Sequence, residues 1–148
     1  MDDHINNSDH DTDLLAWINR QVELLHAKKF DQLDLDNLID EVNDMGGQLK
    51  RELYHRIEIL LMHLLKYKYQ PDHISGSWLG TIGEQRSRIT KLLKDAPSLA
   101  GPLDEHLAEN YASATKRAAA ETGLPKSTFP TTNPFTKQQI LDPDYLPD

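Results

Sequence analysis

Residues 51–70, RELYHRIEILLMHLLKYKYQ, are the most apolar run of this polar chain and decide its fold. Five residues of the run recur at the spacing of one helical face: Leu53, Ile57, Leu60, Leu61 and Leu64. Three more apolar residues fall on the other faces: Ile59, Met62 and Leu65. A helix that is apolar over so much of its circumference has to be covered on more than one side. We therefore expect a central helix with other helices packed around it.

The composition narrows the class of protein. At 148 residues the chain is long enough for one domain with a buried core. It has no cysteine, which excludes disulfides, thiolate nucleophiles and cysteine-ligated metal centres. The acidic start lacks the basic and then apolar pattern of a signal peptide, and no apolar run approaches the roughly 20 residues of a membrane span. We expect a cytoplasmic protein without a membrane segment.

The charge is negative overall and uneven along the chain. The formal net charge of −8 argues against general nucleic-acid binding. Residues 1–47 carry 3 Lys or Arg against 12 Asp or Glu, residues 48–94 carry 9 against 4, and residues 95–148 carry 4 against 8. The basic middle segment could bind an anionic partner. We favour the simpler interpretation, in which acidic outer elements pair with a basic central hairpin.

Periodicity and capping residues predict four main helices and one short one. The predicted ranges are about 12–29, 34–69, 75–94, 97–122 and 137–141. Thr136 and Gln139 form a capping box for the short helix, and Gly123 is placed to end the fourth helix in the left-handed conformation. Because interior glycines are unfavourable, we expect the long second helix to bend at Gly46 and Gly47.

Apolar faces outside the central run are predicted to belong to the core. On the first helix they comprise Leu14, Trp17, Ile18, Val22 and Leu25. On the start of the second helix they comprise Leu35, Leu38, Ile39, Val42, Met45 and Leu49. The third helix has a bare stripe formed by Gly76, Gly80 and Gly83, which predicts close contact with another helix.

The last 25 residues differ in composition from the rest of the chain. Five prolines punctuate them, and apolar residues are too frequent for a free linker. We therefore expect residues 124–148 to lie across the bundle as a strap. With residues 1–11 as a flexible acidic tail and residues 12–123 as the bundle, the prediction is an all-α fold. About four main helices are built around a long central helix, with a Pro-rich C-terminal strap.

Six segments of the chain, in order, follow the pattern of a known family. They are the segment from Asp13 to Trp17, FDQLDLDNLIDEV from Phe30, LLMHLLKYKYQP from Leu60, SWLGTIGEQR from Ser77, AAAETGLPKSTFP from Ala118 and ILDPDYLP from Ile140. The chain thus resembles a bacterial family catalogued as domain of unknown function 29. The resemblance implies an α-helical bundle, and it implies no particular activity because none is assigned to the family. It departs from the family pattern at Leu79, Gly80 and Gly83, where bulkier and more basic residues are expected. This departure argues against an anionic partner on that face.

Arg56 and His63 are the candidate catalytic pair. They are seven residues apart, so they lie on nearly one helical face. The pair resembles the motif of HEPN ribonucleases, where an imidazole takes the proton of a ribose 2′-hydroxyl and a guanidinium stabilises the phosphorane. That motif has a polar residue after the arginine, whereas Ile57 follows here. We favour the structural alternative, in which Arg56 pairs with Glu52 or Glu84 and His63 lies at the core edge.

A second group of side chains is a candidate binding site: Tyr67, Trp78, Gln85, Arg86 and Arg88. Gln85 and Arg86 lie near the apolar face of their helix, and burying a polar group there without a partner costs about 1–3 kcal/mol. We expect Gln85 or Arg86 to meet His63 or Tyr67 on the previous helix. Such a network can orient a ligand, but we favour a role in fixing the register of the helices.

Potential metal ligands are present without a recognisable pattern. The chain has no H-E-x-x-H sequence, and its E-x-x-H pair, Glu52 and His55, is not duplicated in the way that di-iron bundles require. His55 and His106 have acidic neighbours, as histidines in any helical protein of this composition do. We expect neither a metal nor a cofactor.

The favoured function is a non-enzymatic α-helical interaction module that binds a protein partner or a second copy of itself. Exchange of the strap between protomers is one way to make such a dimer. Two alternatives remain open. One is a metal-independent ribonuclease that uses Arg56 and His63, and the other is a nucleic-acid accessory protein that uses the basic residues 48–94.

Overall fold

The computed structural model describes residues 9–148, and every regular element in that range is helical. In chain order these are α2 (Leu14–His26), η1 (Phe30–Gln32), α3 (Leu35–Tyr69), η2 (Pro71–His73), α4 (Gly76–Asp95), η3 (Pro97–Leu99), α5 (Ala100–Thr122), η4 (Lys126–Thr128) and α6 (Lys137–Leu141). The predicted all-α class is confirmed. The chain forms two compact units, Met1–Gln48 and Leu49–Asp148, so the boundary falls inside α3. We call them unit 1 and unit 2.

The segments predicted from the sequence end at residues 11 and 123, whereas the two compact units meet after Gln48. The predicted segments therefore stay a prediction. The predicted flexible tail lies mostly outside the described residues. Its last part does not match the expectation, because residues 9–12 are helical.

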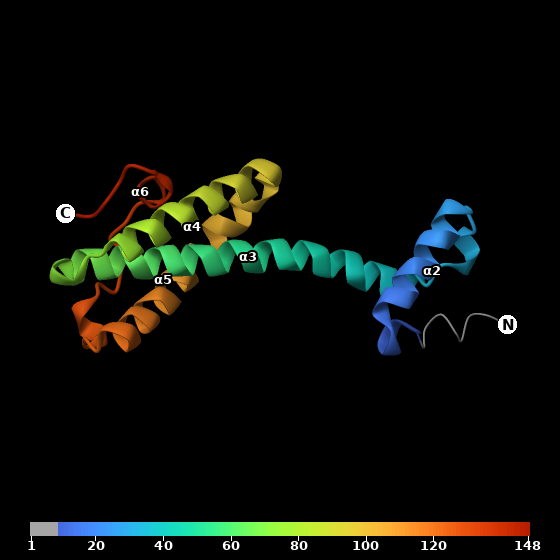
Figure 1. Ribbon diagram of the computed structural model, residues 1–148, viewed down its shortest axis with the longest axis horizontal. Helices are drawn as coiled ribbons and strands as arrows, with labels where there is room; N and C mark the ends of the chain where they lie inside the picture. The colour runs from blue at the N-terminus through green and yellow to red at the C-terminus, as the bar shows by residue number, and fades with distance from the viewer. Residues whose placement is uncertain (1–8) are drawn as a thin grey trace. The chain divides into compact units, whose positions relative to one another are not determined.

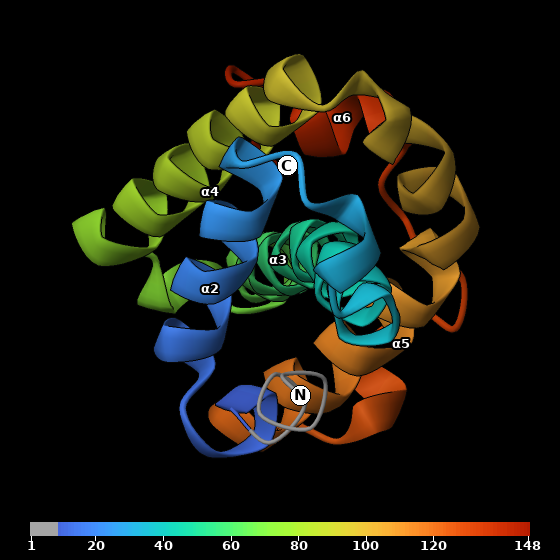
Figure 2. The ribbon, with the colours of Figure 1, turned by 90° about the vertical axis from the view of Figure 1, so that its right-hand side faces the viewer.

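Unit 2 has the predicted central run at its core. The second part of α3 buries Leu53, Ile57, Leu60, Leu61, Met62, Leu64 and Leu65. Helices α4 and α5 lie on either side of this part of α3 (Figures 1 and 2). They add the buried side chains of Ile82, Ile89, Leu103, Tyr111, Ala114 and Ala118. The apolar run thus packs against two helices at once, as its circumference requires.

The helix ends follow the capping residues of the sequence. The side chain of Asp13 accepts a hydrogen bond from the Ala16 amide at the start of α2. Thr136 and Gln139 form the predicted capping box at the start of α6. Gly123 has φ 73°, the left-handed conformation that a glycine adopts most readily after a helix end.

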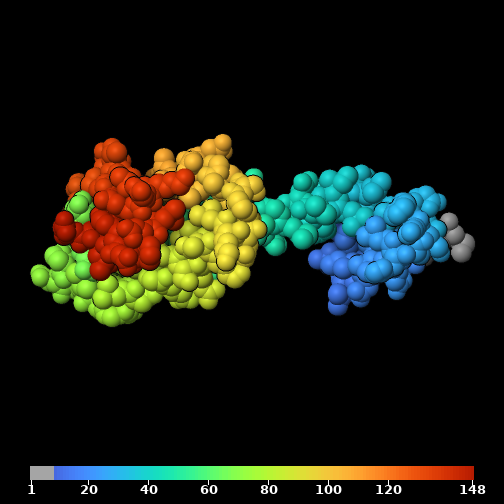
Figure 3. Space-filling model, turned by 90° about the horizontal axis from the view of Figure 1, so that it is seen from above, coloured from blue at the N-terminus to red at the C-terminus, as the bar shows by residue number. Residues whose placement is uncertain are grey.

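The C-terminal segment is an ordered strap on unit 2. Phe129, Phe135 and Ile140 are buried in the same apolar cluster as α3. In Figure 3 the strap covers one face of this unit, between α4 and α5. Its backbone is held by Arg86 of α4, whose guanidinium donates to three carbonyl oxygens. The bonds measure 2.9 Å to Ile140, 2.7 Å to Tyr145 and 3.1 Å to Gln139.

Two predictions concern the glycines of α3 and α4. Helix α3 is continuous through Gly46 and Gly47, where we expected a bend, and the boundary between the two units follows directly after Gln48. The close helix contact that we predicted for the α4 glycines is wrong for the described chain. A Cβ atom added at Gly76, Gly80 or Gly83 would meet no atom within 4 Å, and all three glycines are exposed.

Unit 1 has a small core with a polar centre. Trp17 and Leu24 of α2 are buried, and the Trp17 Nε1–H donates to the Asp34 carboxylate at 2.9 Å. The same carboxylate accepts from Asn37 at 2.7 Å, and the Asp34 amide donates to the Gln21 side chain at 2.9 Å. These bonds join the first two turns of α2 to the residue that precedes α3. They also account for the burial of Gln21 and Asp34, which are polar.

Candidate interaction surface

The first part of α3 exposes a row of large apolar side chains. The row comprises Leu35, Ile39, Val42 and Met45, and each is more than half exposed. These positions follow one another by four, three and three residues, so they lie on one side of the helix. We call this row the α3 stripe. Val42 and Met45 are 64% and 65% exposed, although both belong to types that are usually buried.

Helix α2 exposes a second row. It comprises Leu14, Leu15, Ile18, Val22 and Leu25, and we call it the α2 stripe. The buried residues of the same helix, Trp17, Gln21 and Leu24, lie on the adjacent face. The apolar arc of α2 is therefore wider than the contact that α3 and the turn provide. Monomeric soluble proteins rarely leave apolar patches of this extent uncovered.

Both stripes correct the prediction made from periodicity. We expected the face with Leu14, Ile18, Val22 and Leu25 to lie in the core, but these residues are exposed while Trp17 alone of that face is buried. The predicted core residues Leu35, Ile39, Val42, Met45 and Leu49 are exposed as well. The spacing correctly marks an apolar helix face, but it does not reveal whether the chain itself covers that face.

Charged side chains border the stripes. Asp36, Asp40 and Asp44 are exposed and follow α3 at intervals of four residues. The ion pairs of unit 1 remain within it: His10 contacts Asp11 and Glu41, and Arg20 contacts Glu23. The stripes are thus apolar rows with a polar rim, which is the usual composition of a protein–protein contact surface.

Arg56 and His63 have different neighbours. Arg56 forms an ion pair with Glu52 at 3.0 Å, as the structural alternative predicts, and donates to Gln85 of α4 at 3.2 Å. The His63 Nδ1 atom is 2.9 Å from the Ile59 carbonyl oxygen, and the ring lies in the field of Lys66, Arg117 and Glu121. Arg56 therefore contacts α4, whereas His63 faces the charges of α5.

The five residues of the predicted binding group have different partners within the chain. Gln85 accepts a hydrogen bond from Arg56, and Arg86 binds the strap, so the expected contacts with His63 or Tyr67 are replaced by others. Tyr67 packs against the core of unit 2. Lys66 lies 4.9 Å from the centre of the Trp78 ring. Arg88 is exposed and pairs with Glu84 at 3.1 Å.

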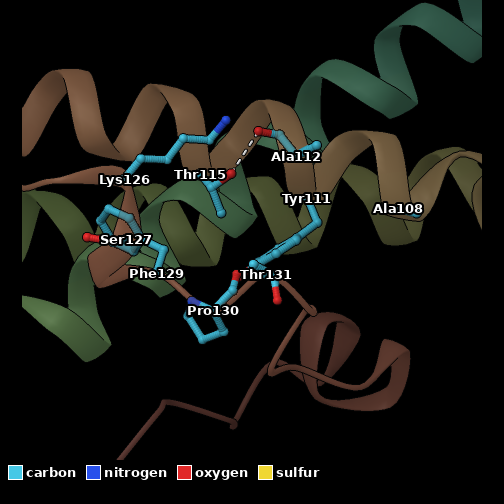
Figure 4. A pocket seen from close by; sticks show the side chains of 9 residues that line it. All are labelled: Ala108, Tyr111, Ala112, Thr115, Lys126, Ser127, Phe129, Pro130 and Thr131. Atoms are coloured by element: carbon cyan, nitrogen blue, oxygen red, sulfur yellow. Dashed lines mark hydrogen bonds between the residues drawn. The ribbon is translucent and has the colours of Figure 1, made fainter.

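The strap and α5 enclose a hollow of about 550 Å³ (Figure 4). Its walls include Tyr111, Thr115, Lys126 and Pro130. The Tyr111 hydroxyl donates to the Pro130 carbonyl oxygen, and the Thr115 hydroxyl donates to the Ala112 carbonyl oxygen at 2.8 Å. Burial raises the pKa of Tyr111 to about 12, so the phenol stays neutral at physiological pH. The hydroxyl groups of Tyr111 and Thr115 are thus already bonded within the chain.

Among residues 9–148, no three His, Cys, Asp or Glu side chains come together in a way that could hold a metal ion. None of the helices described for this chain has both the length and the apolar character needed to cross a bilayer.

Burial lowers the pKa of His63 below its usual value, and the nearby Lys66 and Arg117 act in the same direction. Between the folded value and the ordinary value of 6.5, the unfolded chain therefore binds more protons than the folded one. The free energy of unfolding should fall as the pH drops below about 6.5. Unfolding titrations of unit 2 between pH 5 and 8 will measure this slope, and His63→Gln should flatten it.

His10 should behave in the opposite way. Its hydrogen bonds with Glu41 and Asp11 raise its pKa, so its stabilising effect on unit 1 is present below 6.5 and is lost as the pH rises through the raised value. Proton NMR titration of the imidazole signals should place His10 above an ordinary histidine and His63 below it. The reverse order would contradict both the hydrogen bonds described for His10 and the burial described for His63.

Comparison with known proteins gives one family. The model of the family described as Domain of unknown function DUF29 matches residues 10–146. No curated protein and no solved structure matches the chain.

Proposed function

We propose for this chain, which belongs to the DUF29 family, the function of an α-helical protein–protein interaction module that works through the α2 and α3 stripes. The observation that carries the proposal is the exposure of nine large apolar side chains on two helices of unit 1. Exposing such surface to water is unfavourable, and covering it by a protein partner is favourable, at about 25 cal/mol per Å² of apolar surface.

Unit 2 leaves fewer large apolar side chains exposed than unit 1. Its core is complete, since the central run, α4, α5 and the strap bury one another's apolar side chains. Nine of the fourteen large apolar side chains that are exposed in the described chain lie on α2 and on the first part of α3. The proposed contact surface therefore lies in unit 1, before the boundary at Gln48.

Photo-crosslinking in the native cell tests the proposal. A photoreactive amino acid at position 42 should give covalent adducts with protein, because Val42 is 64% exposed in the middle of the α3 stripe. The matched control is position 79, since Leu79 is also apolar and 42% exposed but lies on α4. Adducts at position 42 and none at position 79 are expected. Equal yields at the two positions, or none at either, would overturn the proposal.

A further inference from the structure

We infer that the partner of the two stripes is a second copy of the chain, in a two-fold symmetric dimer in which α2 and the first part of α3 of each protomer pack as four helices. This inference rests on the proposed function, because it names the occupant of the same surface. A two-fold axis brings the same patch of both protomers together, so the surface has to be complementary to itself. The spacing and the area of the stripes bear on this requirement, and the charge of unit 1 determines how the dimer responds to salt.

The spacing of both stripes suits helix-on-helix packing. On α2, the residues Leu15, Ile18, Val22 and Leu25 follow by three, four and three residues. On α3, Leu35, Ile39 and Val42 of the stripe follow by four and three residues, and Gly46, the neighbour of Met45, continues the alternation four residues after Val42. Alternation of three and four is the spacing of a seam between packed helices. Space is open around Gly46, where a Cβ atom would meet nothing within 4 Å, so another helix can approach the backbone there.

The area is sufficient for a stable dimer. Nine side chains that are 39% to 67% exposed offer roughly 400 Å² of apolar surface per protomer, hence about 800 Å² for the pair. Apolar surface makes up roughly 60% of an interface, which puts the complete contact near 1,300 Å². Specific and stable interfaces start at about 1,200 Å².

The charge gives the dimer a distinctive salt dependence. Residues 1–47 carry 12 acidic against 3 basic side chains, so two copies of unit 1 repel each other. Salt screens such repulsion and strengthens hydrophobic contact at the same time. Association of two copies should therefore tighten as the salt concentration rises. A basic amphipathic helix from another protein would show the opposite trend, because salt weakens attraction between unlike charges.

Light scattering and sedimentation of the full chain test the inference. The wild type should form a particle of twice the chain mass of 16.9 kDa, with a dissociation constant that decreases from low to high salt. Val42→Asp and Ile18→Asp place a charge in each seam, and each should weaken the dimer roughly 100-fold or more. Leu79→Asp is the control and should leave the dimer intact. Far-UV circular dichroism checks that all three variants keep their helices.

Each other outcome is decisive. If the wild type stays monomeric up to high concentration, the inference that the partner is a second copy is wrong. The proposed function then stands only if position 42 still forms adducts with a different protein. A dimer that survives both Asp substitutions uses another surface, and the inference is wrong. A dimer that loosens in salt is held by unlike charges, which also contradicts the inference. If an Asp variant unfolds, the mass and salt dependence of the wild type still decide.

Discussion

Arg86→Met should lower the free energy of unfolding of unit 2 by about 3–5 kcal/mol. Arg86 is 3% exposed, and its guanidinium donates to the carbonyl oxygens of Gln139, Ile140 and Tyr145. Methionine retains much of the apolar packing but leaves the three acceptors without their donor. Each lost bond to a charged group is worth about 1.5–3 kcal/mol, and part of this loss is offset because no charge has to be buried.

Denaturant titration measures the change in stability, and limited proteolysis reports where it occurs. In Arg86→Met, residues after Pro134 should become accessible to protease before the helices do. Arg88→Met is the matched control on the same helix. Its exposed ion pair with Glu84 should contribute no more than about 1 kcal/mol. Equal losses in the two variants would show that Arg86 does not hold the strap.

Trp17→Ala should unfold unit 1, with a loss of about 3–5 kcal/mol. Trp17 is 1% exposed and fills most of the small core of that unit. Trp17→Phe keeps the ring packing but removes the indole N–H that donates to Asp34 at 2.9 Å, so it should cost only about 1–2 kcal/mol. The difference between the two variants separates packing from hydrogen bonding.

The chain offers its own probe for this experiment, because it has two tryptophans and they lie in different units. In Trp17→Ala the remaining Trp78 reports unit 2 alone. Its fluorescence transition should stay near the wild-type midpoint, since the core of unit 2 contains no residue of unit 1. The far-UV circular dichroism signal of the helices should meanwhile begin to fall at a lower denaturant concentration, because unit 1 unfolds first. A Trp78 transition that shifts together with that loss would contradict the independence of the two cores.

The central helix, the caps and the strap could be predicted because their signals are local. The apolar run over residues 51–70 predicts coverage on several sides, and Thr136 with Gln139 specifies the start of α6 within four residues. The pair of Arg56 with Glu52 follows from helical spacing alone. These features need no knowledge of distant parts of the chain.

Two central features could not be predicted, for different reasons. The partners of Arg86 are backbone carbonyl groups 53 to 59 residues away, and a carbonyl group is present in every residue, so no sequence pattern marks these three. The stripes of unit 1 are visible as apolar faces, but the amount of covering protein depends on how the helices finally pack. An exposed face and a core face have the same periodicity.

The link between Arg86 and the strap also has a consequence for the order of events during synthesis. Tyr145 follows Arg86 by 59 positions, and ribosomes add roughly 5–20 residues per second, so the two are separated by on the order of 3 to 12 seconds. During that interval the residues of α4 have already been synthesised, but the carbonyl groups that accept hydrogen bonds from Arg86 have not. The nascent unit 2 therefore stays open to proteases and chaperones until its last residues emerge.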